Sequence, residues 1–380
     1  MTHGPSSAAA SLVAPPREAS HLVGLQALRA VAAMMVVVKH ASQVTSGASP
    51  WLDLGEAGVD IFFVISGFVM AWTTRLGAPT AAATAGPGER GRETRAFVGK
   101  RLLRIVPLYW LASLWTARRE LAQGHFGMPL LKDFFFVPHA SVAEAHRIFP
   151  LLTPGWTLNY EMFFYALVAL SLLVPLRRPW LLLGVLAALA ATGFALPGAD
   201  FTVPDEPFAW QGAAGDAAAL LLHFYTSNIL LEFGFGVMLA WCVRRHAAPA
   251  WPRWIFFLLA LAGFAGLAAG HAFWPRGLCQ GLPAALIVWS ATLALRGWRL
   301  PRTELLGAAS YAIYLFHWAS FGLTKPLAAR LGETDGHPAG IAALIGADVL
   351  VAVVAGVVVH VLVERPFMRA VKTRLSAKRA

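Results

Sequence analysis

The sequence predicts an all-α integral membrane protein with about ten transmembrane helices and both termini on the cytoplasmic side. Hydrophobic residues make up 57% of the 380 residues and charged residues only 13%, with a mean hydropathy of +0.60. A soluble domain carries about 25% charged residues, so this chain has too little charge to cover a soluble surface. Its apolar stretches recur at roughly the length that a helix needs to cross a bilayer, and they are too long for barrel strands.

The expected helices follow these apolar stretches in chain order. They cover residues 22–43, 57–75, 97–117, 155–175, 180–197, 222–243, 254–271, 278–296, 303–325 and 340–363. The third and ninth stretches are the least apolar. We expect a transmembrane domain over 21–367, a disordered Ala/Ser/Pro-rich tail at 1–20 that lacks the apolar core of a signal peptide, and a basic cytoplasmic tail at 368–380.

The placement of the positive charges supports this topology. Of the 31 Lys and Arg residues, 22 fall in predicted cytoplasmic segments or at the cytoplasmic ends of spans, 7 in outer segments or at outer span ends, and two, Arg29 and Lys39, within the first span. This asymmetry is what the positive-inside rule expects. The net charge of +11 is spread over cytoplasmic membrane edges, and it does not form the groove-sized patch that nucleic acid requires.

The connecting segments give weaker signals. We expect residues 76–96, which are rich in Gly, Ala and Thr, to form a flexible loop, and residues 118–154 to contain a re-entrant or interfacial segment around Phe134–Phe136. The two cysteines, Cys242 and Cys279, are expected to be buried thiols, because two residues cannot build a disulfide framework.

The first span carries ionisable groups where they are costly. Arg29 and His40 are eleven residues apart, which places them on one helix face about 16 Å apart along the axis. A cation near the cytoplasmic end and an imidazole deeper in the span suit an anionic ligand that enters from the cytoplasm. A snorkelling arginine and a structural histidine are the alternative.

The second and third spans add a polar stretch and a pair of cations. Gly58–Phe68 contains Asp60 and Ser66; the glycines at 58 and 67 permit close helix packing, and Asp60 is either a pathway residue or a helix N-terminal carboxylate. Arg101 and Arg104 are three residues apart, and two guanidinium groups on one face suit phosphate, although a positive-inside anchor looks the same.

The fourth and ninth spans complete the set. Glu161 follows Tyr160 and is the only acidic residue of the fourth span, where it could orient a histidine or serve as a structural carboxylate. Tyr314 and His317 are three residues apart in the ninth span and can share a face, as they would also in an aromatic belt.

Taken together, these segments resemble the acyltransferase-3 family of integral membrane acyltransferases. The resemblance rests on Arg29 and His40 with ten residues between them, and on Gly58–Phe68, Lys100–Tyr109, Gly155–Phe164, Ser310–His317 and Glu364–Pro366. The segment from Leu25 to Ala33 is similar to the branch that acetylates bacterial exopolysaccharides such as succinoglycan. Lys39 departs from the family pattern, which has an apolar or aromatic residue before the histidine.

The resemblance implies transfer of an acyl group, most often acetyl, from cytoplasmic acyl-CoA to a hydroxyl of a cell-envelope or exported polysaccharide or its lipid-linked precursor. It implies that His40 acts as general base or acyl carrier, that Glu161 orients His40, and that Arg29, Arg101 and Arg104 bind acyl-CoA. The acceptor-side or supporting residues would be Tyr314, His317, Tyr160 and Ser66.

We expect no tightly bound cofactor, with acetyl-CoA as co-substrate, and a location in the cell inner membrane. The expected partners are the bilayer, the carbohydrate acceptor and polysaccharide-biosynthesis proteins. No metal site is expected, because the loop histidines at 125, 139, 146 and 223 lack ligand spacing.

Two other functions suit a multi-span protein with buried charges. A transporter or flippase of a lipid-linked saccharide often shows inverted repeats and paired broken helices, and no matching halves stand out here. A membrane glycosyltransferase would favour a pair of acidic residues near a membrane face, and none stands out. Incorporation of label from acetyl-CoA separates an acyltransferase from a flippase.

Overall fold

The computed structural model describes residues 22–46, 54–76, 86–122, 127–142, 147–174, 178–196, 216–270, 275–298, 300–324 and 338–377. Within these ranges the regular structure is helical and contains no β-strand, which confirms the all-α prediction. The tail predicted at 1–20 lies outside the described residues.

A helix occupies each of the ten predicted places. The main helices are α2 (Leu22–Ser46), α4 (Ala57–Thr73), α5 (Pro87–Thr116), α8 (Trp156–Leu173), α9 (Pro179–Ala195), α11 (Leu230–Arg245), α12 (Arg253–Gly270), α14 (Gly281–Ala294), α15 (Pro301–Phe321) and α17 (Pro338–Val359). Short helices extend or connect them: η1 (Leu54–Glu56), α6 (Arg118–Ala122), α7 (Met128–Phe134), η3 (Thr153–Gly155), α10 (Ala217–Tyr225), α13 (Arg276–Cys279), a π-helical turn (His360–Glu364) and α18 (Arg365–Ala377).

Seven of the helical segments in the described residues are long and apolar enough to cross a membrane. The helix α9 is apolar but has only 17 residues, and α5 and α15 are the two spans that the sequence marks as least apolar. The chain is therefore a multi-pass helical protein, and the count of ten spans stays a prediction.

One predicted boundary is wrong because polar composition was taken as a sign of a loop. The helix α5 begins at Pro87, with Pro at its first turn and an extended Gly86 before it, so residues 87–96 are helical and not a flexible loop. Proline suits this position because its missing N–H would be unpaired there anyway. The last span continues through a π-helical turn into α18, which makes most of the predicted basic tail an amphipathic helix.

The segment predicted as re-entrant or interfacial forms the short helix α7 near the C-terminal end of α5. The indole of Trp110 on α5 donates a hydrogen bond to the carbonyl of Phe134, 3.0 Å away. Phe136 stacks on Tyr109 with ring centroids 4.6 Å apart, and Phe135 is exposed. This contact fixes α7 against α5.

The helices α4 and α11 pack closely against each other. A Cβ atom on Gly67 would lie 2.1 Å from the carbonyl oxygen of Phe233, and one on Gly236 would lie 2.0 Å from that of Val64. Small residues let membrane helices approach in this way, and Gly58 meets the α2 carbonyl of Ala32 likewise, which confirms the packing role predicted for these glycines.

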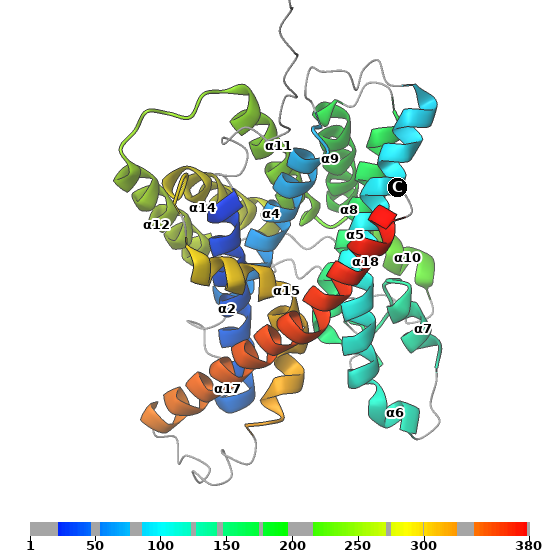
Figure 1. The fold of residues 1–380 in the computed structure, drawn as a ribbon, viewed down its shortest axis with the longest axis vertical. Coiled ribbons are helices and arrows are strands. Elements are labelled where there is room, and N and C mark those ends of the chain that lie inside the picture. The colour runs from blue at the N-terminus through cyan, green and yellow to red at the C-terminus, as the bar shows by residue number, and fades with distance from the viewer. Residues whose placement is uncertain are drawn as a thin grey trace, which may run out of the picture.

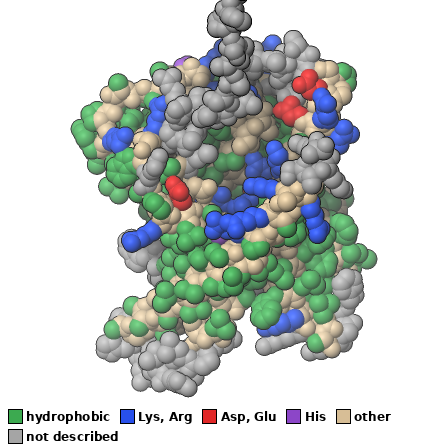
Figure 2. All heavy atoms as spheres, in the orientation of Figure 1, with side chains coloured by type: hydrophobic (Ala, Val, Ile, Leu, Met, Phe, Trp, Pro, Cys, Tyr) green, Lys and Arg blue, Asp and Glu red, His purple; other side chains and the backbone are tan. Residues whose placement is uncertain are grey.

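Figure 1 shows α2, α4, α14 and α15 on one side of the molecule and α5, α8 and α9 on the other, with α17 and α18 crossing the front. In the same orientation, Figure 2 shows hydrophobic side chains over much of the lower half and Lys and Arg side chains across the middle of this face. Cys242 and Cys279 are half-buried free thiols.

Candidate active site

A cavity of about 150 Å³ lies between helices α2, α4, α5, α8 and α15. Six of the nine predicted site residues line it: Arg29, Ser66, Arg101, Arg104, Glu161 and Tyr314. Segments that are more than 280 residues apart in the sequence therefore contribute to one site. Phe62, Thr157, Tyr165, Ser310 and Tyr311 also line it, together with apolar side chains.

The cavity is rich in positive charge. Arg29 has no hydrogen bond or ion pair to any residue that the structure describes. Arg101 donates to Thr73 Oγ1 at 3.1 Å and lies over the ring of Tyr165, while Arg104 pairs with Glu364 at 2.9 Å. The three guanidinium groups outnumber the nearby carboxylates, so the cavity has an excess of positive charge and favours an anionic ligand.

Glu161 on α8 faces Ser66 on α4. The Ser66 hydroxyl oxygen lies 2.5 and 2.7 Å from the two carboxylate oxygens, and it donates its hydrogen to them. No hydrogen bond joins Glu161 to His40 among the described residues. The structure thus places the predicted carboxylate in the cavity wall, with Ser66 as its partner.

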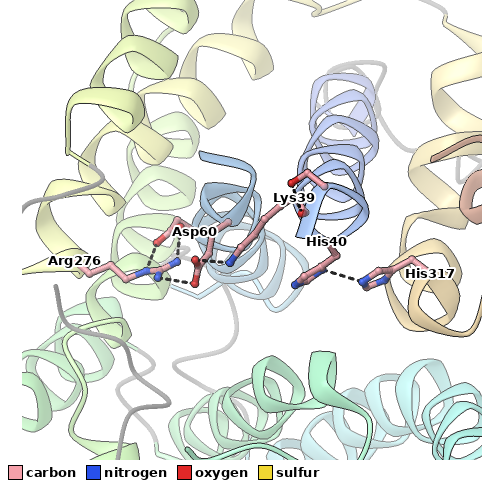
Figure 3. A network of polar contacts seen from close by, with 7 residues as sticks. Lys39, His40, Asp60, Arg276 and His317 are labelled. Carbon is pink, nitrogen blue, oxygen red and sulfur yellow. Dashed lines mark hydrogen bonds and ion pairs between the residues drawn. The ribbon is translucent and has the colours of Figure 1, made fainter. Parts of the chain in front are cut away.

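His40 on α2 instead faces His317 on α15 (Figure 3). The planes of the two rings are nearly parallel, and His40 Nδ1 lies 3.0 Å from His317 Nε2. His317 is fully buried, and its Nδ1 atom lies 2.7 Å from the carbonyl oxygen of Tyr314. From the sequence, His317 was expected only as an acceptor-side or supporting residue. Its pairing with His40 was not predicted.

These contacts determine the protons on both rings. A carbonyl oxygen only accepts hydrogen bonds, so His317 Nδ1 carries a hydrogen. In a neutral imidazole the other nitrogen then accepts, so His40 Nδ1 must donate to His317 Nε2. His40 Nε2 is left with a free lone pair, which is the form that a general base or nucleophile needs.

Tyr314 connects the cavity with the histidine pair. Its ring lines the cavity, lies 5.9 Å from Phe62 and 6.1 Å from His317, and its hydroxyl lies 3.0 Å from Thr157 Oγ1. His40 and His317 do not themselves line the cavity. Tyr314 thus borders both the cavity and the histidine pair.

Tyr160 lies outside the cavity and contacts Phe224. Its hydroxyl donates to the carbonyl of Phe224 at 2.7 Å, and its buried ring stacks on the ring of Phe224 at 4.0 Å. It supports the aromatic packing of α8 and does not reach the cavity. Tyr165, four residues after Glu161, was missed, although that spacing puts both on one helix face.

A chain of ion pairs adjoins His40 (Figure 3). Lys39 pairs with Glu56 at 2.7 Å, and Arg276 on α13 reaches Glu56 at 3.2 Å. Arg276 also forms two hydrogen bonds of 3.0 Å to the buried carboxylate of Asp60. Lys39 is thus paired. Asp60, at the start of α4, accepts two hydrogen bonds from Arg276.

The described residues contain no group of three or more His, Cys, Asp or Glu side chains that could hold a metal ion. The predicted loop histidine His139 instead binds the buried carboxylate of Asp133 at 2.8 Å. His125 and His146 lie outside the described residues.

The sequence is similar to a known protein family and to individual members of it. Residues 22–363 match the family profile described as an acyltransferase domain. The chain is 32% identical to the exopolysaccharide production protein ExoZ of Rhizobium meliloti (strain 1021), covering 84% of this chain and 92% of that protein. It is 28% identical to the acyltransferase MdmB of Streptomyces mycarofaciens over 93% of both chains. No solved structure matches it.

Proposed function

Because this chain belongs to the acyltransferase-3 family, as a multi-pass membrane protein, we propose that it transfers an acyl group from cytoplasmic acyl-CoA to a carbohydrate hydroxyl. The acyl group is acetyl, and the acceptor is a cell-envelope or exported polysaccharide or its lipid-linked precursor. The similarity to an exopolysaccharide production protein supports this acceptor class. The protein would lie in the cell inner membrane.

The observation that carries the proposal is the free Nε2 lone pair of His40. His317 accepts the hydrogen of His40 Nδ1 and is itself fixed by the carbonyl of Tyr314. His317 holds His40 in one tautomer and one orientation, as the carboxylate of a catalytic triad does for its histidine. His317 is therefore the positioning residue for His40, a role that the resemblance assigned to Glu161.

The direct route has one proton acceptor and one leaving group. His40 Nε2 removes the proton of the acceptor hydroxyl, and the oxygen attacks the thioester carbonyl carbon. The carbon–oxygen bond forms, the carbon–sulfur bond breaks, and the proton passes from His40 to the departing thiolate. Throughout, His40 Nδ1 can keep its hydrogen bond to His317.

The second route uses His40 as acyl carrier. Nε2 attacks the thioester carbon, the carbon–sulfur bond breaks, and the thiolate leaves and takes a proton from water. The acceptor oxygen then attacks the acyl-imidazole carbon and releases its proton to water, and the carbon–nitrogen bond breaks, which restores the lone pair of Nε2. This route lets donor and acceptor bind in turn from opposite sides of the membrane. Both routes need the same tautomer of His40.

The cationic cavity supplies the donor site. Arg29 faces it without a protein partner among the described residues, and Arg101 and Arg104 share the next wall. Arginine forks bind phosphate with two parallel hydrogen bonds, so these side chains would hold the phosphates of CoA. The acyl-pantetheine arm would extend past Tyr314 toward His40, about 16 Å further along α2 than Arg29.

The test is the transfer of labelled acetyl from acetyl-CoA to extracted envelope glycans. Membranes that contain the wild type are compared with membranes from cells that carry the empty vector. Alkali-labile label in a glycan only when the protein is present supports the proposal. Absence of label, together with protein-dependent movement of a lipid-linked saccharide across the membrane, would instead support the flippase function.

A further inference from the structure

His40 lies near one end of its helix. It is 18 residues after the start of α2 and six before its end, or about 27 Å and 9 Å along the axis. In the predicted topology the nearer end is the outer one, and the donor cavity lies toward the cytoplasm. Among the described residues, η1 and the start of α4 follow this end of α2, and η1 packs against Lys39.

The side chains at that position have unused hydrogen-bonding capacity. Within the part of the chain that the structure describes, Lys39 has three N–H donors and shows one contact, to Glu56, and Glu56 has about four acceptor sites and shows two contacts. The Lys39 and Glu56 side chains are 13% and 18% exposed, so both can be reached. In Figure 3 the His40 ring lies between His317 on one side and this ion-pair chain on the other.

The Lys39 and Glu56 members of this ion-pair chain carry opposite charges. Lys39 offsets Glu56, and Arg276 interacts with the buried carboxyl groups of Asp60 and Glu232, whereas the donor cavity has an excess of arginine. A balanced set of donors and acceptors suits a neutral ligand rich in hydroxyl groups, because each hydroxyl both donates and accepts. An anion such as CoA is favoured by the cavity and not here.

An aromatic ring completes the surroundings of His40. The ring centroid of Trp318 lies 5.0 Å from that of His40, and Trp318 is 36% exposed. Small-molecule sites combine apolar or aromatic walls with a few placed polar groups. The C–H face of a sugar ring can pack on such an indole while its hydroxyls reach the polar side.

We propose that Lys39, Glu56 and Trp318 form the acceptor subsite for a neutral sugar residue, which rests on the transferase function proposed above. Lys39 donates to a sugar oxygen, Glu56 accepts from a sugar hydroxyl, and Trp318 packs against the ring. The neighbouring hydroxyl is then presented to His40 Nε2. Lys39 thus determines acceptor binding and does not take part in the chemistry.

The test uses the glycan that the wild type labels, stripped of acetyl groups with mild alkali, as the titrated acceptor. The full-length protein in detergent is assayed as wild type, Lys39→Gln, Lys39→Arg and Glu56→Gln, with Lys132→Gln on α7 as the matched control. For each protein the KM for glycan, the KM for acetyl-CoA, and acetyl-CoA hydrolysis without glycan are measured.

We expect Lys39→Gln and Glu56→Gln to raise the KM for glycan roughly tenfold or more, the effect of losing a hydrogen bond to a charged group. The KM for acetyl-CoA and the hydrolysis rate should stay near wild type. Lys39→Arg keeps the charge and the N–H donors and should raise the KM for glycan less than Lys39→Gln does, and Lys132→Gln should behave like wild type. A fall in kcat and hydrolysis with unchanged KM for glycan would show that the ion pair only holds α2 in place, and would overturn the proposal.

The two proposals fail in different ways. A wild type that labels no glycan removes the transferase function and this subsite with it. A wild type that labels glycan, with variants whose KM for glycan is unchanged, removes the subsite alone.

Discussion

His40 Nδ1 lies 3.0 Å from Nε2 of His317, and this contact decides which nitrogen of His40 can react. The two residues are 277 positions apart and meet because α2 packs on α15. Since the other nitrogen of His317 faces the carbonyl of Tyr314, only one arrangement of hydrogens satisfies both contacts of the neutral pair. The first prediction tests this arrangement.

Replacing His317 with Leu removes the acceptor for His40 Nδ1 and frees the ring to adopt the other tautomer. We expect kcat to fall roughly 10²–10⁴-fold, the range for lost general-base function, with little change in the KM for acetyl-CoA. His317→Gln keeps a side-chain oxygen that can accept, and should retain more activity than His317→Leu. Equal losses in the two variants at matched protein levels would count against the tautomer argument.

Glu161 offers a direct contrast, because its partner is Ser66 and not His40. Glu161→Gln should therefore lower kcat at least tenfold less than His317→Leu does, while changing the KM for acetyl-CoA through the charge of the cavity. Steady-state kinetics of the two variants, prepared in parallel, measure this difference. If Glu161→Gln lowered kcat as much as His317→Leu, Glu161 and not His317 would be the residue that orients His40.

Arg29 faces the cavity without a partner among the described residues, so its charge is available to a ligand. Arg29→Gln should raise the KM for acetyl-CoA roughly tenfold or more, as expected for a lost charge-assisted hydrogen bond. It should leave the KM for acetyl-pantetheine, which lacks the nucleotide phosphates, nearly unchanged. Arg95→Gln on α5 is the matched control; equal effects on both donors would exclude phosphate binding by Arg29.

The close contact of α4 and α11 makes a prediction about stability. The Cβ of Gly236→Ala would meet the backbone carbonyl oxygen of Val64 at 2.0 Å, which forces the helices apart. We expect a loss of about 1–3 kcal/mol, the cost of overpacking, and a lower apparent melting temperature in detergent. Gly184→Ala on α9, where a Cβ meets nothing within 4 Å, should be neutral or slightly stabilising. Equal melting temperatures for the two variants would show that the contact is not tight.

Much of the site follows from the sequence because it depends on spacing within one helix. The shared face of Arg29 and His40 follows from eleven residues of helix, and the pair Arg101 and Arg104 from a spacing of three. The cavity brings Arg29, Arg101 and Arg104 together as expected.

The side-chain contacts between helices depend on which helices pack together. The periodicity within a single helix does not predict that packing. The sequence offered Glu161 on α8 as the partner of His40, whereas in the structure His40 pairs with His317 on α15. The choice between them is made by packing, with Ser66 on α4 taking the carboxylate. Lys39 departed from the family pattern in the sequence, but its partner Glu56 precedes the expected start of a span and was not singled out. The helical start of α5 was missed because a helix can be polar where it leaves the membrane.

The most direct test of the account is acetyl transfer by His40→Ala, compared with wild type at matched expression. Labelled acetyl-CoA is the donor and the extracted envelope glycans are the acceptor. We predict that the wild type labels a glycan and that His40→Ala does not, although its KM for acetyl-CoA, measured on any residual activity, stays near wild type. Equal labelling by both proteins would show that His40 neither accepts the proton nor carries the acyl group, and would contradict the mechanism.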